Sequence, residues 1–471
     1  MSVVDVFVTS WSSEPYTGGA YSTLGVGATP TDRSALTEVL GARLTFAGEH
    51  LSVDHPATMH GAYNSGCEAA QRLLLVQPEA RTAVIIGAGL AGLAAAQVLR
   101  AAGLEVTVLE ATAKVGGRAR TDRIWGNRPI HPGAAWIHGT IGNPLAELAR
   151  SVDLAFPPEP PQTQHVVVTI HQQSKEPTQF GPAATLDASA VLNVLKTTSA
   201  VHEALSTAAQ AHRRTGQPDE TIKPTLLVLL NELADPSLRA AVGTQLIQHF
   251  ESLLAGSIDD ISLHFGDEPY AYPGGDHYIT TPLEPLIQKL TEAISVKLSS
   301  PVSTLKIDKS SVHIVSAQSY TADIVVVAVP LIPLQREAIA FDPPLPIALR
   351  ASIHRLRMGS KTKVFVRFAE RWWGDTQTIW VYPSTGTHEP GAPVDELDPT
   401  VSPLWPEWVD ATDVAGVPTL FGFVSGLEGK RIADLALTPE GLAQVRREVE
   451  NLFAAIQPSL IADKEPAQAT G

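Results

Sequence analysis

The chain has 471 residues, which is enough for two or three domains or for one large interleaved pair. Its hydrophobic fraction of 44% and charged fraction of 18% are typical of a soluble globular protein. The net charge of -15 argues against a nucleic-acid partner and could attract a cationic substrate, although excess acid also serves solubility. Cys67 is the only cysteine, which excludes an intramolecular disulfide.

No secretion or membrane signal is expected. The N-terminal stretch MSVVDVFVTSWSSEPY lacks a basic segment followed by a long apolar core, so it does not predict a signal peptide. No run of about 18 apolar residues occurs in the chain. We therefore expect a cytoplasmic protein without a membrane partner, and we expect no metal site.

The N-terminal region contains a helix signal before any recognisable domain begins. Residues 45–74 read TFAGEHLSVDHPATMHGAYNSGCEAAQRLL. Pro56 suits the first turn of a helix, and a long helix that includes Cys67 is predicted to follow it. This stretch reads like the end of a protein, although it lies near the start of the chain.

The strongest local pattern lies in residues 82–111, TAVIIGAGLAGLAAAQVLRAAGLEVTVLEA. A short apolar strand leads into Gly87, Gly89 and Gly92, a helix follows, and a second strand ends on Glu110. Glycines at this G-x-G-x-x-G spacing permit a tight turn, close approach of a diphosphate and close packing of helix against strand. The helix N-terminus supplies unpaired N–H groups, and Glu110 can bind a ribose hydroxyl. The pattern predicts a dinucleotide-binding βαβ unit.

A second glycine turn follows at once. Arg118 comes directly after Gly116 and Gly117, where a guanidinium group suits phosphate oxygens. Farther along the chain, the periodicity predicts helices at 189–214, 224–234 and 438–456, alternating strands within 293–330 and 361–368, and more strands or loops at 402–408 and 418–426. The stretch FDPPLP is a rigid connection, and residues 457–471 are typical of a loosely ordered tail.

Taken together, these pieces resemble the flavin-containing amine oxidase family, particularly its polyamine oxidase and monoamine oxidase branches. The matching stretches include VGGRART, HPGAAWIHGTIGNPLAELA, ADIVVVAVPLIPL, GSKTKVFVRF, WSSEPYTGGAYS and LTFAGEHLSVDHPATMHGAYNSG, besides the glycine motif. They cover most of the chain apart from residues 155–260. The order departs from the family, because the stretches at 11–22 and 46–62 normally lie near the C-terminus. The sequence therefore looks circularly permuted, with LVQPEAR joining the usual end to the usual beginning.

The resemblance implies FAD as cofactor. It assigns to FAD the residues Gly87, Gly89, Gly92, Glu110, Arg118, Gly133, Ala134, Ala135, Trp136, Val302, Trp11, Glu49, Thr58 and Met59. The glycines, Glu110 and Arg118 would hold the ADP half, and Glu49 would lie beside the ribityl-phosphate portion. The dipole of the helix that begins near Thr58 would favour the reduced, anionic flavin. Ala20 stands where monoamine oxidases carry the cysteine bonded to FAD, so non-covalent FAD is expected.

The resemblance also names four residues for catalysis. Tyr21 matches one wall of the family's aromatic cage, and Thr58 matches the opposite wall. Lys363 matches the lysine that holds a water near flavin N5, although Lys361 has the same strand parity and competes for that role. His138 would recognise or deprotonate a substrate amine. The stretch GAAWIHG contains no arginine for a substrate carboxylate, which favours an amine over an amino acid.

The expected fold is α/β plus α+β, with a Rossmann-like FAD-binding domain interleaved with a substrate domain of mixed sheet and helices. The FAD domain is assigned to residues 1–140 and 270–335, its segment 1–75 having moved to the front. The substrate domain is assigned to residues 141–269 and 336–456.

The expected reaction is oxidation of a polyamine or a primary or secondary monoamine by FAD and O2, which gives an aldehyde and H2O2 in a monomer or homodimer. Two alternatives stay open. One is a flavin oxidase or desaturase of a non-amine hydrophobic substrate, and the other is an inactive flavin-binding interaction module.

Overall fold

The computed structural model describes residues 2–158, 165–170, 183–268, 270–383 and 405–462. The chain divides into two compact units, each built from separate segments. Unit 1 comprises Met1–Ser10, Pro160–Asp267 and Ser360–Gly471, and unit 2 comprises Trp11–Glu159 and Glu268–Gly359. Both units therefore draw on residues that are far apart in the sequence, as expected for interleaved domains.

Unit 2 is built on a five-stranded parallel sheet with the strand order β12-β5-β4-β16-β3. The strands are β12 (Ser295–Lys297), β5 (Glu105–Leu109), β4 (Thr82–Ile86), β16 (Ile324–Val327) and β3 (Leu44–Phe46). The first βαβ crossover is β4, α3 (Leu90–Ala101) and β5, as the glycine motif predicts. Four of the five residues of β4 and all four of β16 are buried, which is typical of central parallel strands.

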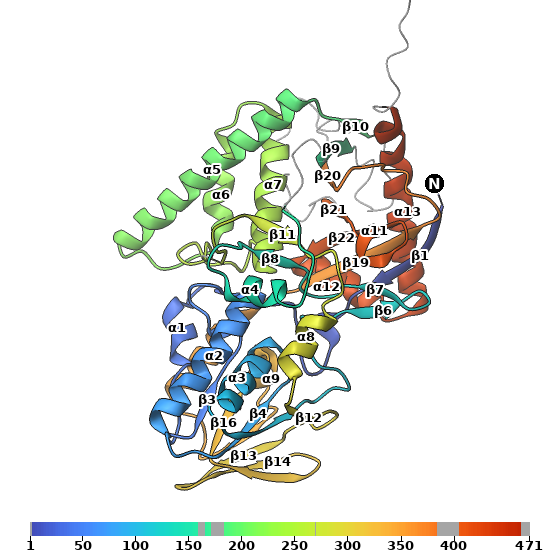
Figure 1. Cartoon of the computed structure of the whole chain (residues 1–471). Coiled ribbons are helices and arrows are strands. Elements are labelled where there is room, and N and C mark those ends of the chain that lie inside the picture. The colour runs from blue at the N-terminus through green and yellow to red at the C-terminus, as the bar shows by residue number, and fades with distance from the viewer. Residues whose placement is uncertain (1, 159–164, 171–182, 269, 384–404, 463–471) are drawn as a thin grey trace, which may run out of the picture. The chain divides into compact units, whose positions relative to one another are not determined.

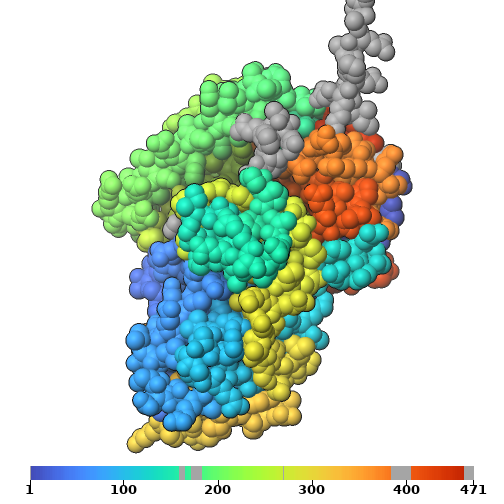
Figure 2. Space-filling view, in the orientation of Figure 1, coloured from blue at the N-terminus to red at the C-terminus, as the bar shows by residue number. Residues whose placement is uncertain are grey.

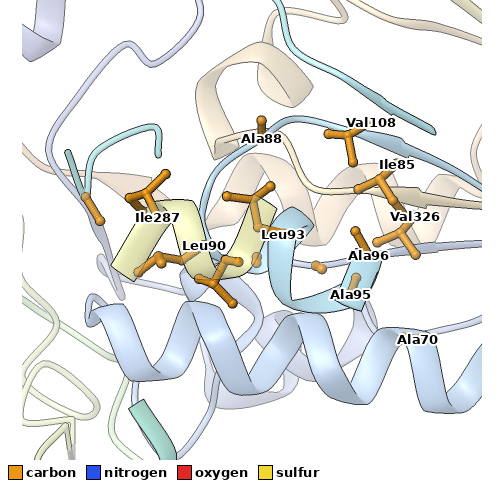
Figure 3. Packing of buried hydrophobic residues seen from close by; sticks show 14 of the residues in the cluster. Ala70, Ile85, Ala88, Leu90, Leu93, Ala95, Ala96, Val108, Ile287 and Val326 are labelled. Atoms are coloured by element: carbon orange, nitrogen blue, oxygen red, sulfur yellow. The ribbon is translucent and has the colours of Figure 1, made fainter. Parts of the chain in front are cut away.

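The core of unit 2 lies between this sheet and its helices. α2 (Met59–Val76) and α3 lie side by side (Figure 1), and they approach so closely that a Cβ on Gly66 would lie 2.0 Å from the Ala91 carbonyl oxygen. Figure 3 shows Leu93 and Ala96 of α3 among Ile85, Val108 and other apolar side chains of this core. This packing holds the start of α3 against the ends of β4 and β5.

Smaller elements complete unit 2. A second sheet has the order β15 (Ser319–Ala322), β14 (Val312–Val315), β13 (Thr304–Ile307) and β17 (Ala340–Asp342). Three short pairs are β2 (Ser22–Thr23) with β18 (Arg357–Met358), β6 (Asp122–Ile124) with β7 (Arg128–Ile130), and β8 (Trp136–His138) with β11 (Asp276–Tyr278). The helical elements are η1 (Trp11–Ser13), α1 (Pro30–Ala35), η2 (Glu49–Leu51), α4 (Pro144–Arg150), α8 (Glu284–Thr291), α9 (Leu331–Gln335) and α10 (Ile347–Arg355).

Unit 1 is built on a seven-stranded sheet with the order β1-β19-β22-β21-β20-β9-β10. The strands are β1 (Val3–Val8), β19 (Lys361–Phe368), β22 (Thr419–Ser425), β21 (Glu407–Asp410), β20 (Thr378–Pro383), β9 (His165–Ile170) and β10 (Ala184–Thr185). All neighbours are antiparallel except β20 and β9. One face packs on α13 (Pro439–Ala462) through a cluster that includes Val364, Trp408 and Phe453.

The other face of the sheet in unit 1 carries a helical layer at the β20 and β9 end. This layer is α5 (Ala188–Arg214), α6 (Ile222–Asn231) and α7 (Pro236–Leu254), which share a core with Val167 and Tyr382. α5 exposes its outer side (Figure 2), and its buried residues are Val194, Val201, Leu205 and Ala209. The short α11 (Thr412–Ala415) and α12 (Gly426–Leu435) complete the unit.

The compact units differ from the expected domain limits in three segments and at Glu268, which belongs to unit 2. Residues 1–10 belong to unit 1, because β1 pairs antiparallel with β19. Residues 141–159 belong to unit 2, because α4 buries Leu145 and Ala149 in the core of that unit. Residues 336–359 also belong to unit 2, where β17 pairs with β13.

Two local expectations need correction. The last helix runs to Ala462, so residues 457–462 are helical rather than part of a tail, while residues 463–471 lie outside the described residues. Pro56 lies before α2 and not in its first turn, because Ala57 adopts φ 62° and the helix starts only after its N-cap, Thr58. The other predicted helices and strands are present with small shifts of their ends, and residues 402–404 of the stretch expected at 402–408 lie outside the described residues.

Candidate functional site

The glycine turn of unit 2 is shaped for a ligand beside the helix N-terminus. Gly87 has φ 104° and is so close to β16 that a Cβ would lie 2.6 Å from the Ala328 carbonyl oxygen. A Cβ on Gly92 would lie 1.9 Å from the Gly87 carbonyl oxygen. Gly89 differs, because no heavy atom of the described residues lies within 4 Å of the Cβ it would carry. Two glycines therefore serve packing, and Gly89 leaves open space at the N-cap of α3.

Glu110 lies at the end of β5 and faces the same turn. Its Oε2 accepts a hydrogen bond from the Ala88 N–H at 2.7 Å, and its Oε1 accepts from the Thr112 N–H and hydroxyl at 2.9 and 2.8 Å. Oε2, which accepts one hydrogen bond, has a further lone pair to accept from a ribose hydroxyl. Val302 is buried on the approach to β13, and its adenine contact stays a prediction.

Arg118 and Glu49 form an ion pair in unit 2. The Arg118 Nη1 donates to Glu49 Oε1 at 3.0 Å and to the Ala20 carbonyl at 2.7 Å, while its Nε and Nη2 make no hydrogen bond within the described part of the chain. Those two donors suit a phosphate, as predicted. Glu49 also accepts from the Ser22 hydroxyl at 2.6 Å and from the Ala57 N–H at 3.1 Å.

The environment of Glu49 holds the carboxylate ionised. Burial alone would raise the pKa of Glu49, but Arg118 and the Ser22 hydroxyl oppose this effect, and the pKa falls to about 2. A buried carboxylate near an anionic cofactor requires a partner, and Arg118 is that partner for Glu49.

A buried network that the sequence did not indicate supports this ion pair. Arg33 is fully buried, and its Nε and Nη2 donate to the two oxygens of Glu268 at 2.7 and 2.8 Å. Its Nη1 donates to the Ser22 hydroxyl at 2.7 Å and to the His50 carbonyl at 3.0 Å. Because Ser22 in turn donates to Glu49, Arg33 fixes the segment that presents Glu49 and Tyr21.

The residues expected around the flavin ring gather near Arg118. Trp11 is buried, its Nε1 donates to the Pro132 carbonyl at 3.0 Å, and the Arg120 guanidinium lies 4.7 Å from its ring centroid. A Cβ on Gly133 would lie 1.9 Å from the Arg118 carbonyl oxygen and 3.2 Å from the Trp11 ring. Ala134, Ala135 and Trp136 follow directly and lead into β8. Their predicted contacts with the flavin remain predictions.

The start of α2 is stabilised by its own cap. The Thr58 hydroxyl donates to the His55 carbonyl and accepts from the Gly61 N–H, both at 2.9 Å. Thr58 and Met59 thus begin the helix whose N-terminal dipole the prediction invokes. The Thr58 hydroxyl is already used for capping, and its role as a wall of a substrate cage remains a prediction.

Tyr21 and His138 have a common neighbour that the sequence did not single out, Tyr270. Burial is the main cause that raises the pKa of Tyr21, and Glu49 and Tyr270 add to it. The His138 ring meets Tyr270 edge-on at 5.3 Å, and the His138 Nδ1 lies 2.9 Å from the Asp276 carboxylate. Tyr270 is positioned by its backbone carbonyl, which lies 2.7 Å from the His60 Nε2. An aromatic and imidazole cluster therefore lies next to the predicted cofactor residues of unit 2.

Lys363 is the predicted site residue that lies in unit 1, on β19. Its side chain is buried, and its Nζ lies 5.0 Å from the Phe421 ring and 5.6 Å from the Phe423 ring. Burial, followed by the charge of Lys361, lowers the pKa of Lys363 well below its ordinary value. Burial therefore favours the uncharged form of this amine.

Lys361 lies on the same face of β19, as the strand parity predicts. Its Nζ donates to the Ser252 carbonyl at 3.0 Å and hydroxyl at 2.7 Å, and it lies 4.1 Å from the Phe423 ring. Burial lowers the pKa of Lys361 to about 8, although Glu407 raises it in part. The two lysines thus differ in their partners, and the choice between them for the flavin reaction remains a prediction.

No helix among the residues that the structure describes is long and apolar enough to cross a membrane. No group of three or more His, Cys, Asp or Glu side chains in those same ranges is placed to hold a metal ion.

Comparisons with known proteins agree with this geometry. The family described as flavin containing amine oxidoreductase matches residues 2–74 and 90–468, and the pyridine nucleotide-disulphide oxidoreductase family matches residues 42–129. Polyamine oxidase 3 of Oryza sativa subsp. japonica is 28% identical over 312 residues, which are 64% of this chain and 63% of that protein. Lysine-specific histone demethylase 1 homolog 2 of Arabidopsis thaliana is 31% identical over 301 residues, 62% of this chain and 38% of that protein. The match spans less than two thirds of either relative.

Solved structures show the same fold. Cyclohexylamine oxidase from Brevibacterium oxydans IH-35A aligns with a TM-score of 0.57 and 22% identity over 81% of this chain and 82% of that one. Putrescine oxidase bound to putrescine aligns with a TM-score of 0.56 and 21% identity over 82% of this chain and 83% of that one. The mixed α/β fold with a Rossmann-like FAD-binding part is thereby confirmed.

Proposed function

The chain belongs to the flavin containing amine oxidoreductase family, and on that basis we propose that it is an FAD-dependent amine oxidase. The observation that carries this proposal is the open space beside Gly89, flanked by Glu110 and the unused donors of Arg118. These groups fit a dinucleotide, because they offer helix N–H donors, a ribose acceptor and a phosphate donor. FAD, when bound, would supply the acceptor for a hydride from the carbon next to the amine, and O2 would then be reduced to H2O2.

The protein holds the cofactor through residues of unit 2. Gly87, Gly89 and Gly92 shape the diphosphate turn, while Arg118 binds phosphate and Glu49 keeps Arg118 oriented. The remaining residues assigned to the cofactor are Trp11, Thr58, Met59, Gly133, Ala134, Ala135, Trp136 and Val302. Ala20 offers no nucleophile, so the cofactor is held without a covalent bond.

Four side chains are assigned to the reaction. Tyr21 supplies an aromatic wall that orients the amine, and Thr58 shapes the opposite wall. His138, with Asp276 at 2.9 Å, takes the proton from a substrate ammonium so that the amine reacts in its neutral form. Lys363 has a buried amine beside aromatic rings, where burial favours its uncharged form, and this suits it to hold a water molecule by hydrogen bonding.

The names of the relatives support a proposal for the substrate class. A plant relative is named a polyamine oxidase, and proteins of the same fold are named putrescine oxidase and cyclohexylamine oxidase. A polyamine or a primary or secondary monoamine is therefore the proposed substrate, and an aldehyde is the proposed product. The acidic surface charge is consistent with a cationic amine in solution.

We also propose that the chain order is circularly permuted relative to the family. Support comes from β3, an N-terminal strand that forms an edge of the parallel sheet beside β16. Residues 77–81 then join α2 directly to β4, the first strand of the glycine motif. Near the termini, Arg446 of α13 donates to the Val3 carbonyl at 2.8 Å. A reordered gene that starts at residue 80, links residue 462 to residue 2 and ends at residue 77 is expected to give a protein that binds FAD and melts like the wild type. A folded product that binds no FAD would contradict this proposal.

The function is tested by anaerobic reduction of the bound flavin. The panel contains a polyamine, a linear monoamine, cyclohexylamine, a methylated-lysine peptide and a free amino acid. Bleaching of the flavin absorbance is measured without oxygen, and peroxide formation is then measured in air. At least one amine is expected to bleach the flavin, and Tyr21→Ala is expected to weaken its binding. Purified holoenzyme that no amine reduces would refute the assignment and favour a non-amine substrate or an inactive flavin protein.

A further inference from the structure

Two arginines follow the second glycine turn of unit 2, and their guanidinium groups have different surroundings. Arg118 keeps two nitrogens without a hydrogen bond within the described part of the chain. In Arg120, by contrast, every guanidinium nitrogen already donates. Its Nε and Nη2 donate to the Asp122 carboxylate at 3.2 to 3.3 Å, and its Nη1 donates to the Gly117 carbonyl at 3.4 Å. Arg120 is therefore fixed by the protein, whereas Arg118 is open to a ligand.

The Arg120 guanidinium covers a face of the Trp11 ring. Its Cζ lies 4.7 Å from the ring centroid, a distance at which a cation is attracted to an indole face. The Trp11 ring is otherwise anchored along an edge, where Nε1 donates to the Pro132 carbonyl at 3.0 Å and Cζ2 would lie 3.2 Å from a Cβ on Gly133. A ring held along one edge can tilt about that edge. The guanidinium on its face fixes the plane of the ring.

The positive charge of Arg120 is only partly balanced by its carboxylate partner. Asp122 is shared, because the Lys114 Nζ donates to the same carboxylate at 2.6 Å. Burial alone would raise the pKa of Asp122, but Lys114 and Arg120 lower it, so the group consists of two cations and one anion. Arg123, on the same strand β6, has the carboxylate of Glu284 as its partner at 2.8 Å. Arg120 thus retains charge for the indole face, and Arg123 offers a matched cation for comparison.

Arg120 also connects Trp11 to the first glycine turn. Gly117, whose carbonyl accepts from Arg120, packs on that turn so closely that its Cβ would lie 3.4 Å from the Gly89 Cα. One guanidinium therefore contacts both the segment that lies against the proposed diphosphate site and the ring that is proposed to face the flavin.

We propose that Arg120 is a positioning residue that holds the Trp11 ring in the plane in which it packs against the flavin of FAD. Arg120 acts through Trp11 and does not touch the cofactor. This inference rests on the proposed FAD-dependent function. It gives the two arginines of VGGRART separate tasks, since Arg118 binds phosphate and Arg120 orients the wall of the flavin ring.

The test is a double-mutant cycle on FAD binding. The wild type, Arg120→Met, Trp11→Leu and the double variant are prepared as holoenzyme, and FAD dissociation constants are measured from flavin fluorescence on dilution. Arg120→Met is expected to weaken FAD binding about tenfold and to change the visible circular dichroism of the bound flavin. In the Trp11→Leu background the same replacement is expected to change the dissociation constant less than about twofold, because no ring is left to position. Arg123→Met should behave like the wild type.

The cycle distinguishes positioning from other roles of Arg120. A tenfold loss in both backgrounds would show that Arg120 acts on FAD without Trp11, and it would overturn the proposal. An unchanged dissociation constant and spectrum in Arg120→Met would overturn it as well. If Arg120→Met does not fold, Arg120→Lys decides, because lysine keeps the charge but not the planar group. A loss of about threefold is then expected, and wild-type behaviour would contradict the role.

No amine enters these measurements, so the positioning role and the oxidase activity can fail separately. The expected cycle in a protein whose flavin no amine reduces would support the role of Arg120 and remove the oxidase activity. Additive variants in a protein that oxidises an amine would remove only the role of Arg120. A wild type that binds no FAD would overturn both.

Discussion

Replacing Gly89 by alanine separates cofactor binding from folding. Gly89 adopts φ -79° and ψ 178°, which alanine also adopts without strain. The new Cβ would meet no heavy atom of the described residues within 4 Å. Nothing in the fold of unit 2 therefore requires glycine at this position, and the requirement must come from what occupies the open space.

The expected magnitudes differ for stability and for binding. Alanine restricts the unfolded chain, which stabilises the fold, but it is a poorer N-cap than glycine, so the free energy of unfolding should change by less than about 1 kcal/mol. A methyl group beside the helix N-terminus keeps a diphosphate from the first-turn N–H groups. Losing one or two charge-assisted hydrogen bonds costs about 2 to 4 kcal/mol, which weakens FAD binding roughly 30- to 1000-fold.

The assay combines thermal unfolding of the apoprotein with fluorescence titration of FAD. Gly92→Ala is the matched control, because its Cβ would lie 1.9 Å from a backbone oxygen and should lower the melting temperature of the apoprotein itself. Gly89→Ala should melt like the wild type and lose its cofactor. If Gly89→Ala binds FAD with wild-type affinity, the open space at α3 is not the diphosphate site.

Two further outcomes follow from individual side chains. Lys363→Met should slow turnover or flavin reoxidation on the order of 100-fold in stopped-flow mixing with O2, and unchanged kinetics would remove Lys363 from the reaction. Because Glu49 has a pKa near 2 in the fold against an ordinary 4.5, its contribution of about 3 kcal/mol is present above pH 4.5 and is lost as pH falls toward 2. Urea unfolding between pH 3 and pH 7 should therefore be less pH-dependent in Glu49→Gln, and an identical profile would contradict the ion pair.

Much of the candidate cofactor site could be predicted because its motifs are defined by the spacing of residues that are close together in the sequence. The glycine motif, Glu110 and the turn at Arg118 lie within one stretch of chain, and the βαβ unit that they predict is present. Strand periodicity likewise placed Lys361 and Lys363 on one face of β19, which the sheet confirms. Where a side chain depends on a neighbouring backbone angle, the prediction was wrong, as at Pro56, which precedes α2 because Ala57 turns the chain.

The sequence by itself determined where the βαβ unit with its glycine turn lies and which residues alternate on a strand, because those properties depend on neighbours a few positions apart. Only the tertiary structure decided that Arg33 meets Glu268 and that Gln248 meets Glu407, since these partners are separated by 235 and 159 positions. It also decided that the Glu49 carboxylate is held by Arg118 within unit 2. The neighbouring residues in the sequence do not indicate such pairings. A charged or amide side chain can face either water or a buried partner, and the sequence around it does not distinguish the two. Their energies arise from burial, and burial is a property of the assembled fold.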